Sequence, residues 1–498
     1  MNNFKPGTTV FDRGESGRYA LTIPDPDVET EPLDELIPED LLREDDAELP
    51  ELSQIELIRH YTSISQVNYG VDTGPYPLGS CTMKYNPRIN EEVARIPGFA
   101  EAHPLQGEAN SQGVLRIQYE LAELLKGVAG LPGITIQPAA GAHGEFLGML
   151  LLKRYFEERG ELEQRRTVLL PDSAHGTNPA SANIAGFDVK EIPSDDEGMV
   201  HVDALRDLVD ETVAGLMVTV PNTLGIFEED IFEITELLHD AGALCYFDGA
   251  NLNSIVGRAK PGDFGIDIVH FNLHKTFSTP HGGGGPGSGP VAVNKDLEPY
   301  LPVPALVKNE DASISLDDDR PKSIGRLHPF YGNVGMHVRA YTYIRMLGDS
   351  GLKRVSENAV LNANYLKERL KHYYRLPFDR ICKHEFVLSG DGLSDDEDVH
   401  TADIAKRLID KGLHPPTVYF PMVVNEALMI EPTETVSLEE LDEVAEAFIQ
   451  VAEEASEDPE LLKTAPHETP VGRLDDVQAA RHPVVRYPKS NGAATNGS

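Results

Sequence analysis

Lys275 is the residue whose surroundings most clearly suggest chemistry. It lies in FNLHKTFSTP (271–280), after an apolar run and directly before the glycine-rich stretch HGGGGPG (281–287). Lysine is almost never fully buried without a partner, so a lysine that enters an apolar, glycine-lined turn needs one. A desolvated lysine amine can form an imine with an aldehyde cofactor. If Lys275 stood alone, a side chain reaching from a strand end to solvent would be the better interpretation.

Asp248 is the second chemically suggestive residue, because it ends the apolar run ALCYFD (243–248). A carboxylate at this position can pair with the protonated nitrogen of a pyridine ring and keep that ring an electron sink. The small residues that follow would let a flat ring approach, and Ala250 is a candidate floor beneath one ring face. The alternative is an aspartate that caps the start of a helix.

The turn PAAGAHGE (138–145) joins an expected strand to an expected helix. The first backbone N–H groups of a helix have no partner within it, so Gly141, Ala142 and His143 form a candidate seat for a cofactor phosphate. Many strand-to-helix turns are rich in glycine, so this signal is weak by itself.

Two further turns carry polar candidates. In DSAHGTNP (172–179), His175 could stack on the upper face of the ring, although a histidine satisfied within the core is the alternative. In VPNTLG (220–225), the amide of Asn222 or the hydroxyl of Thr223 could hydrogen-bond the phenolate oxygen of the cofactor.

An alternation of short apolar runs and helical patterns must position these residues. We expect strands at 134–138, 167–170, 216–220, 243–248 and 268–272, with helices at 145–158 and 231–238. Apolar strands separated by helices indicate a mostly parallel α/β sheet, and such sheets bind ligands at the carboxyl ends of their strands. The candidates follow the order found in the aspartate-aminotransferase superfamily, which is fold-type I of the pyridoxal-phosphate (PLP) enzymes.

The chain is long enough for more than one domain, with 498 residues. We expect an acidic N-terminal arm (1–60), a large α/β domain that binds PLP (61–340), a smaller C-terminal α+β domain (341–456) and a low-complexity tail (457–498). Residues 24–52 are rich in Pro, Asp and Glu, which favours an extended arm.

The net charge of the chain argues against one class of partner. The chain has 82 Asp and Glu against 43 Lys and Arg, a formal net charge of −39, and this makes nucleic acid an unexpected partner. The acidity has two interpretations, an ordinary solvated surface or adaptation to a salt-rich cytoplasm, and we favour the second.

The cysteines and the apolar content point to a soluble protein of the cytoplasm. The three cysteines form no CxxC pair, which argues against a disulfide framework and a zinc site, so no metal is expected. The sequence shows no signal peptide and no run that is long and apolar enough to span a membrane.

The sequence also resembles one family, subunit 2 of the decarboxylating glycine dehydrogenase, the split form of the P-protein of the glycine cleavage system. The resemblance spans roughly residues 50 to 450, and the first and last of its motifs are specific to the family. His143 departs from the glutamine that the family more often carries, but the backbone phosphate seat does not depend on that side chain. The matching motifs are YPLGSCTMKYNP (76–87), HGTNPAS (175–181), NLHKTF (272–277), YGNVG (331–335) and the run from HPPTVYFP to EPTET (414–435).

The resemblance implies a glycine dehydrogenase (aminomethyl-transferring) that uses PLP. Lys275 would carry the cofactor as a Schiff base and His274 would contact it. Glycine would lose its carboxylate as CO2, and the aminomethyl group would pass to the lipoyl arm of H-protein. Two copies of this chain would assemble with two of subunit 1. Residues 80–82 either form a structural loop or line the substrate entrance, and we favour the second interpretation.

Two alternatives stay open. The first is another fold-type I decarboxylase that acts on a bulkier amino acid, since the His274-Lys275 pair occurs there too. The second is a structural subunit without activity, against which Lys275 and Asp248 speak.

Overall fold

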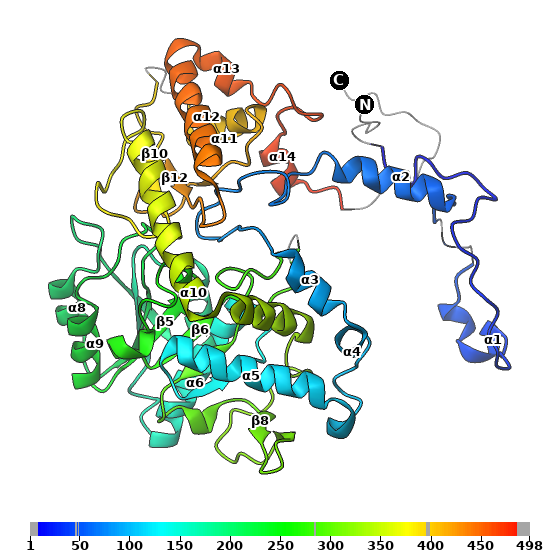
Figure 1. Ribbon diagram of the computed structural model, residues 1–498, viewed down its shortest axis with the longest axis horizontal. Coiled ribbons are helices and arrows are strands. Elements are labelled where there is room, and N and C mark those ends of the chain that lie inside the picture. The colour runs from blue at the N-terminus through cyan, green and yellow to red at the C-terminus, as the bar shows by residue number, and fades with distance from the viewer. Residues whose placement is uncertain (1–7, 45–46, 48, 283–284, 395–398, 486–498) are drawn as a thin grey trace. The chain divides into compact units, whose positions relative to one another are not determined.

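The computed structural model describes residues 8–44, 47, 49–282, 285–394 and 399–485 (Figure 1). Contacts divide the chain into two units, Met1–Gly70 with Pro466–Ser498, and Val71–Ala465. Every candidate residue named above lies in the second unit. The end of the predicted tail, 486–498, lies outside the described residues.

A seven-stranded sheet forms the centre of the second unit, with the strand order β1-β7-β6-β5-β4-β2-β3. Strands β3, β2, β4, β5 and β6 run parallel, whereas β7 is antiparallel to both of its neighbours. This mostly parallel α/β architecture confirms the predicted fold class. The strands are β1 (Gly133–Thr135), β2 (Thr167–Pro171), β3 (Asp188–Ile192), β4 (Val213–Thr219), β5 (Leu244–Gly249), β6 (Ile268–Phe271) and β7 (Val291–Val293).

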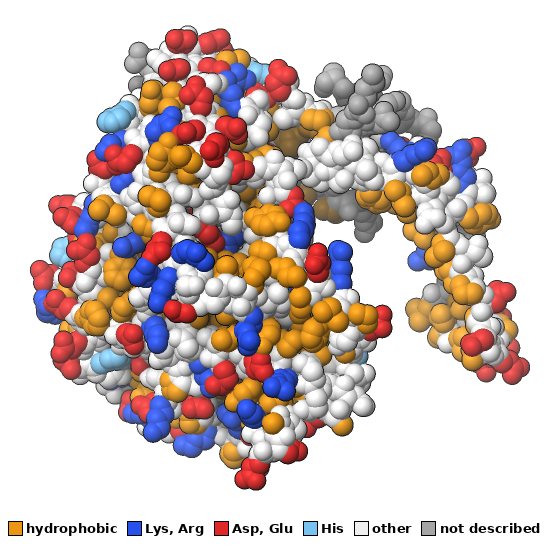
Figure 2. All heavy atoms as spheres, viewed as in Figure 1, with side chains coloured by type: hydrophobic (Ala, Val, Ile, Leu, Met, Phe, Trp, Pro, Cys, Tyr) orange, Lys and Arg blue, Asp and Glu red, His pale blue; other side chains and the backbone are white. Residues whose placement is uncertain are grey.

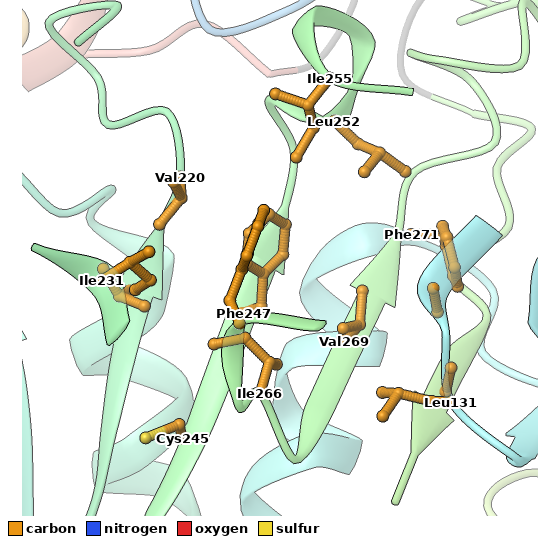
Figure 3. Packing of buried hydrophobic residues seen from close by; sticks show 14 of the residues in the cluster. Leu131, Val220, Ile231, Cys245, Phe247, Leu252, Ile255, Ile266, Val269 and Phe271 are labelled. Carbon is orange, nitrogen blue, oxygen red and sulfur yellow. The ribbon is translucent and has the colours of Figure 1, made fainter. Parts of the chain in front are cut away.

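Alternate residues of each strand point to opposite sides of the sheet, and both sets are apolar. Helices therefore cover both faces. On β5, Cys245 and Phe247 pack in a cluster that includes α9 and α10, whereas Tyr246 packs with α6 on the other face. Figure 3 shows Phe247 between Ile266 and Leu252 in the first cluster. The helices are α5 (Gln112–Ala129), α6 (Gly141–Arg159), α7 (Thr177–Ala185), α8 (Val202–Leu208), α9 (Ile231–Asp240) and α10 (Val334–Leu370).

A smaller antiparallel sheet, with the order β10-β12-β11, packs with helices at the C-terminal side of the unit. The predicted boundary at residue 340 falls inside α10, which is kinked where Gly348 has φ 59°. The predicted tail begins with α13, whose Leu462 is buried in this second core. The elements are β10 (Phe386–Ser389), β11 (Thr417–Val418), β12 (Ala427–Ile430), α11 (Thr401–Asp410), α12 (Leu438–Glu457) and α13 (Pro459–Lys463).

Short elements complete the second unit. The β8–β9 hairpin is antiparallel, and the helices α3 and α4 follow the segment that enters the unit. Their bounds are α3 (Arg88–Ala94), α4 (Pro97–Ala100), β8 (Ala305–Lys308) and β9 (Ile314–Asp317), and the 3-10 turns are η2 (Glu108–Asn110), η3 (Leu252–Ser254), η4 (Pro261–Phe264) and η5 (Glu298–Tyr300).

The first unit has little regular structure in the segment predicted to be extended. It contains α1 (Leu33–Leu36), η1 (Glu39–Leu41), α2 (Gln54–Ser65) and α14 (Asp476–Arg481). A capping box between Ser53 and Glu56 begins α2.

Acidic side chains are spread over the face shown in Figure 2, with basic ones between them. In the ranges that the structure describes, no helix has the length and apolar character needed to cross a membrane.

Candidate active site

The carboxyl ends of the parallel strands gather the predicted residues. Because β2, β4, β5 and β6 are parallel, the turns that follow them lie along one edge of the sheet. Asp248 lies near the carboxyl end of β5, and the turns carry His175, Asn222, Thr223, Ala250, His274 and Lys275.

Lys275 is half-buried, and its Nζ donates to the backbone oxygen of Ser80 at 2.9 Å. Ser80 has φ 62°, a left-handed conformation that is uncommon for a residue with a side chain. The residue before it approaches β12 closely, since a Cβ on Gly79 would lie 2.6 Å from the backbone oxygen of Met429. The segment 80–82, predicted to line the substrate entrance, therefore meets the lysine directly.

Asp248 is buried and has three polar neighbours. Its Oδ2 accepts from Nδ2 of Asn178 at 3.0 Å, its Oδ1 accepts from the backbone N–H of Ala250 at 2.9 Å, and Nε2 of His270 lies 3.4 Å from Oδ1. Burial raises the pKa of Asp248, but His270 and these hydrogen bonds outweigh it and hold the pKa below its usual value. The carboxylate is therefore ionised, as a partner for a protonated ring nitrogen must be.

Sequence reasoning missed a second carboxyl next to this aspartate. Oε2 of Glu145 accepts from the same Asn178 amide at 2.8 Å, and its Oε1 accepts from the Thr177 hydroxyl at 3.0 Å. Burial, followed by the charge of Asp248, raises the pKa of Glu145 to about 7. The available signal was a glutamate within the otherwise apolar face of α6.

The predicted phosphate seat lies at the first turn of α6, which begins at Gly141. A Cβ on Gly141 would lie 2.1 Å from Oδ1 of Asn272, so only glycine fits this close approach. Ala142 and His143 continue the turn, and Nδ1 of His143 accepts from the backbone N–H of Ala139 at 3.2 Å. The side chain of His143 thus supports the turn, and the backbone N–H of His143 stays available at the start of the helix.

His175 is exposed, and its Nδ1 lies 2.7 Å from Oγ1 of Thr177. Its ring packs edge-on against Phe420, with centroids 5.6 Å apart. Although part of the residue is exposed, the atoms packed around its ring keep water from it. This desolvation, followed by the charge of Lys275, lowers the pKa of His175 and favours a neutral ring. A ring satisfied within the core does not describe this residue.

The side chains of Asn222 and Thr223 use their donors within the chain. Nδ2 of Asn222 donates to the oxygen of Gly198 at 2.7 Å and to Glu228 at 3.0 Å. The hydroxyl of Thr223 donates to the oxygen of Ser173 at 2.6 Å. The predicted hydrogen bond to a phenolate oxygen would have to replace one of these bonds.

His274 adds a buried nitrogen next to the lysine. Its Nδ1 has no hydrogen-bond partner within the described part of the chain. Burial, followed by the charge of Lys275, lowers the pKa of His274 to about 3. The neutral ring of His274, the Gly141 turn, the Lys275 amine and the ionised Asp248 together fit a phosphate-bearing aldehyde cofactor.

A buried lysine holds the entering segment onto the site. Nζ of Lys84 lies 2.7 Å from Oε1 of Glu434 and donates to Oδ1 of Asn253 and to the oxygen of Thr276, both at 2.8 Å. Thr276 follows Lys275 in the chain, so this network links the lysine turn to the segment after β12.

Two family models match parts of the chain. The C-terminal domain of glycine dehydrogenase matches residues 355–467, and aminotransferase class-V matches residues 150–298. The second match includes Asp248 and Lys275.

Full-length relatives share more than half of their residues with this chain. A protein of Caldanaerobacter subterraneus subsp. tengcongensis described as "probable glycine dehydrogenase (decarboxylating) subunit 2" is 57% identical and covers 96% of this chain and 98% of its own. A protein of Halalkalibacterium halodurans with the same description is 56% identical over 97% and 99%.

Solved structures share the fold at lower identity. A glycine decarboxylase (P-protein) of the glycine cleavage system, in inhibitor-bound form, has a TM-score of 0.70 at 22% identity and covers 84% of this chain and 94% of its own. The cysteine desulfurase of Thermococcus onnurineus NA1 has a TM-score of 0.61 at 16% identity, over 78% and 98%.

Proposed function

The chain belongs to the family of glycine dehydrogenase (decarboxylating) subunit 2, and we propose that it provides the site at which that enzyme decarboxylates glycine. The observation that carries the proposal is that Lys275 and the ionised, buried Asp248 lie along one edge of the parallel sheet, close enough for the charge of Lys275 to lower the pKa of Asp248. The cofactor is pyridoxal phosphate. When bound, it supplies the electron sink that lets the carboxylate of glycine leave as CO2.

The chain's own residues would hold and orient this cofactor. Lys275 would hold it covalently through Nζ, Asp248 would pair with the ring nitrogen, and His175 would cover one ring face. The first turn of α6, from Gly141 to His143, would take the phosphate. Positioning and exclusion of water matter more here than a strong acid, because the departing carboxylate must stand perpendicular to the ring.

The product and the partners complete the proposal. The aminomethyl group would pass to the lipoyl arm of H-protein, and the active assembly would contain two copies of this chain and two of subunit 1. The relatives are described as a subunit 2, which supports a partner subunit. A cytoplasmic setting with high salt belongs to the same proposal, on the net charge of −39.

Borohydride fixation tests the site. The wild-type chain, incubated with pyridoxal phosphate and reduced, should carry the cofactor on the peptide that contains Lys275, and Lys275→Ala should carry none while it keeps its fold. Cofactor fixed equally to the variant would show that another lysine holds it.

Exchange of labelled bicarbonate into glycine tests the reaction. This chain alone should exchange poorly, addition of subunit 1 should restore the exchange, and lipoylated H-protein should raise it further. No exchange in any mixture would favour a decarboxylase of a bulkier amino acid, and full exchange by the chain alone would remove the need for subunit 1.

A further inference from the structure

Two glutamates meet at one end of the smaller sheet. Glu385 directly precedes β10 and Glu431 directly follows β12, and the antiparallel register pairs Phe386 with Ile430. Both glutamates are 0% exposed. A carboxylate oxygen of each and a ring nitrogen of His384 lie within 4.8 Å of one another. We refer to Glu385 and Glu431 as the carboxyl pair.

The two carboxyls differ in their hydrogen bonds. Glu385 accepts from the backbone N–H of Ser80 at 2.8 Å and from Nδ2 of Asn251 at 3.1 Å. The hydroxyl of Thr82 lies near Glu431 and lowers its pKa, but among the described residues no group makes a hydrogen bond of good geometry to either oxygen of Glu431. An ionised carboxylate without partners is very costly to bury, so the pair must hold a proton or another positive charge.

Burial acts on both groups, and the charge of Glu385 also acts on Glu431. Burial raises the pKa of Glu385 to about 7. Burial, followed by the charge of Glu385, raises the pKa of Glu431 well above its usual value. Near neutral pH, one proton shared by two carboxyls is the expected state.

Ser80 connects the carboxyl pair to the lysine. Its N–H donates to Glu385, and its carbonyl oxygen accepts from Nζ of Lys275 at 2.9 Å. The positive charge of Lys275 is close enough to lower the pKa of both glutamates. A single residue, held with φ 62°, thus separates the amine from the pair.

The other titratable groups near the pair add no free positive charge. Burial lowers the pKa of His384 to about 3 and raises that of the Cys81 thiol, so both are neutral. The charge of Glu434, which acts on Glu431, is balanced by its ion pair with Lys84 at 2.7 Å.

We propose that Glu385 and Glu431 share one proton and act as the general acid–base pair of Lys275. When the Lys275 amine reacts, an N–H bond at Nζ breaks and an O–H bond forms on the pair, through an intervening water. The ammonium and the shared carboxylate become an amine and a second carboxylic acid. The proton returns when the amine is released, and nothing is oxidised or reduced.

This inference rests on the proposed role of Lys275, and the first test follows attachment of the cofactor instead of turnover. The full chain is freed of cofactor and mixed with pyridoxal phosphate, and borohydride fixes the attached fraction at timed intervals over a range of pH. Glu431→Gln and Glu385→Gln should attach it roughly 100-fold more slowly at neutral pH. The deficit should shrink at high pH, where hydroxide can replace the carboxyl pair as the proton acceptor.

Glu228→Gln is the matched control. Glu228 is also buried, and burial raises its pKa to about 7, but it accepts hydrogen bonds from Val200 and Asn222 in a turn at the start of α9. This variant should attach the cofactor at the wild-type rate. Glu431→Asp, which keeps a carboxyl, should recover much of the rate and covers the case in which the glutamine variant does not fold.

The outcomes separate the inference from the function. A deficit that is equal at every pH, or equal to that of Glu228→Gln, would overturn the acid–base pair and leave a structural role. A wild-type chain that is never fixed at Lys275 would overturn the proposed function itself.

Infrared spectroscopy tests the shared proton directly. The wild-type spectrum minus that of Glu431→Gln should contain a protonated carboxyl band at pH 6, where an ordinary glutamate is ionised. A missing band, together with a stoichiometric divalent cation in metal analysis, would show that His384 and the two glutamates bind a metal instead.

Discussion

Asp248 and Glu145 both accept a hydrogen bond from the side-chain amide of Asn178. The surroundings lower the pKa of Asp248 and keep it ionised, whereas they raise the pKa of Glu145 to about 7, so Glu145 holds a proton more readily. The two carboxyls therefore have different tasks, and the charge of Asp248 is the one available to a ring nitrogen.

Asp248→Asn should keep the cofactor but lose about 100-fold or more in glycine–bicarbonate exchange, because a neutral amide cannot stabilise a protonated pyridine nitrogen. The exchange is measured with subunit 1 present, and borohydride fixation confirms that the cofactor is still attached. Exchange at the wild-type rate would remove Asp248 from the site.

Glu228 gives a prediction about pH. Its folded pKa of about 7 exceeds the ordinary value of 4.5, so the stability linked to its proton is complete below pH 4.5 and is lost as the pH rises through 7. Between pH 5 and 8, wild type should lose about 2.5 kcal/mol relative to Glu228→Gln. Urea unfolding of both proteins at the two pH values measures this, and parallel pH profiles would contradict the buried proton.

The sequence indicates only part of the site. Lys275, Asp248 and His175 could be found because each lies at the end of a predicted strand or within five residues after it, where parallel sheets bind ligands. Glu385 and Glu431 could not, because the antiparallel register of β10 and β12 brings them together and no local pattern reveals a register.

Strands that consist of an apolar run were predicted well from the sequence, and strands that lack such a run were missed. The predicted strand 243–248 corresponds to β5 (Leu244–Gly249), since its residues are buried on both faces. The edge strand β3 has the sequence DVKEI and exposes most of its residues, so nothing in its hydrophobicity marks it. The short β7 has three residues, too few for a pattern.

Lys84 joins several elements, and its loss should be costly. Lys84→Met should destabilise the protein by about 3–5 kcal/mol, because it leaves the mostly buried Glu434 without its partner. Urea unfolding measures the loss, and the double variant Lys84→Met/Glu434→Leu, which removes both charges, should recover much of it. A loss below 1 kcal/mol would mean that water or another group replaces the lysine.

At the scale of the whole molecule, charge sets the dependence on salt. With a net charge of −39, self-repulsion should grow as the Debye length lengthens from about 3 Å at 1 M to about 10 Å at 0.1 M salt. The melting temperature should therefore fall by several degrees on dialysis from 2 M to 0.1 M KCl. Circular dichroism measures the melt, and an unchanged melting temperature would leave the ordinary solvated surface as the interpretation.

The bridge through Ser80 also sets an order of events on the ribosome. Ser80 is separated from Lys275 by 195 positions and from Glu385 by 305. A nascent chain that has just exposed its lysine still lacks the carboxyl pair, which emerges only after more than a hundred further residues are made. Contacts of such long range form late in folding. The amine therefore meets the carboxyl pair only after the strands β10 and β12 have been made.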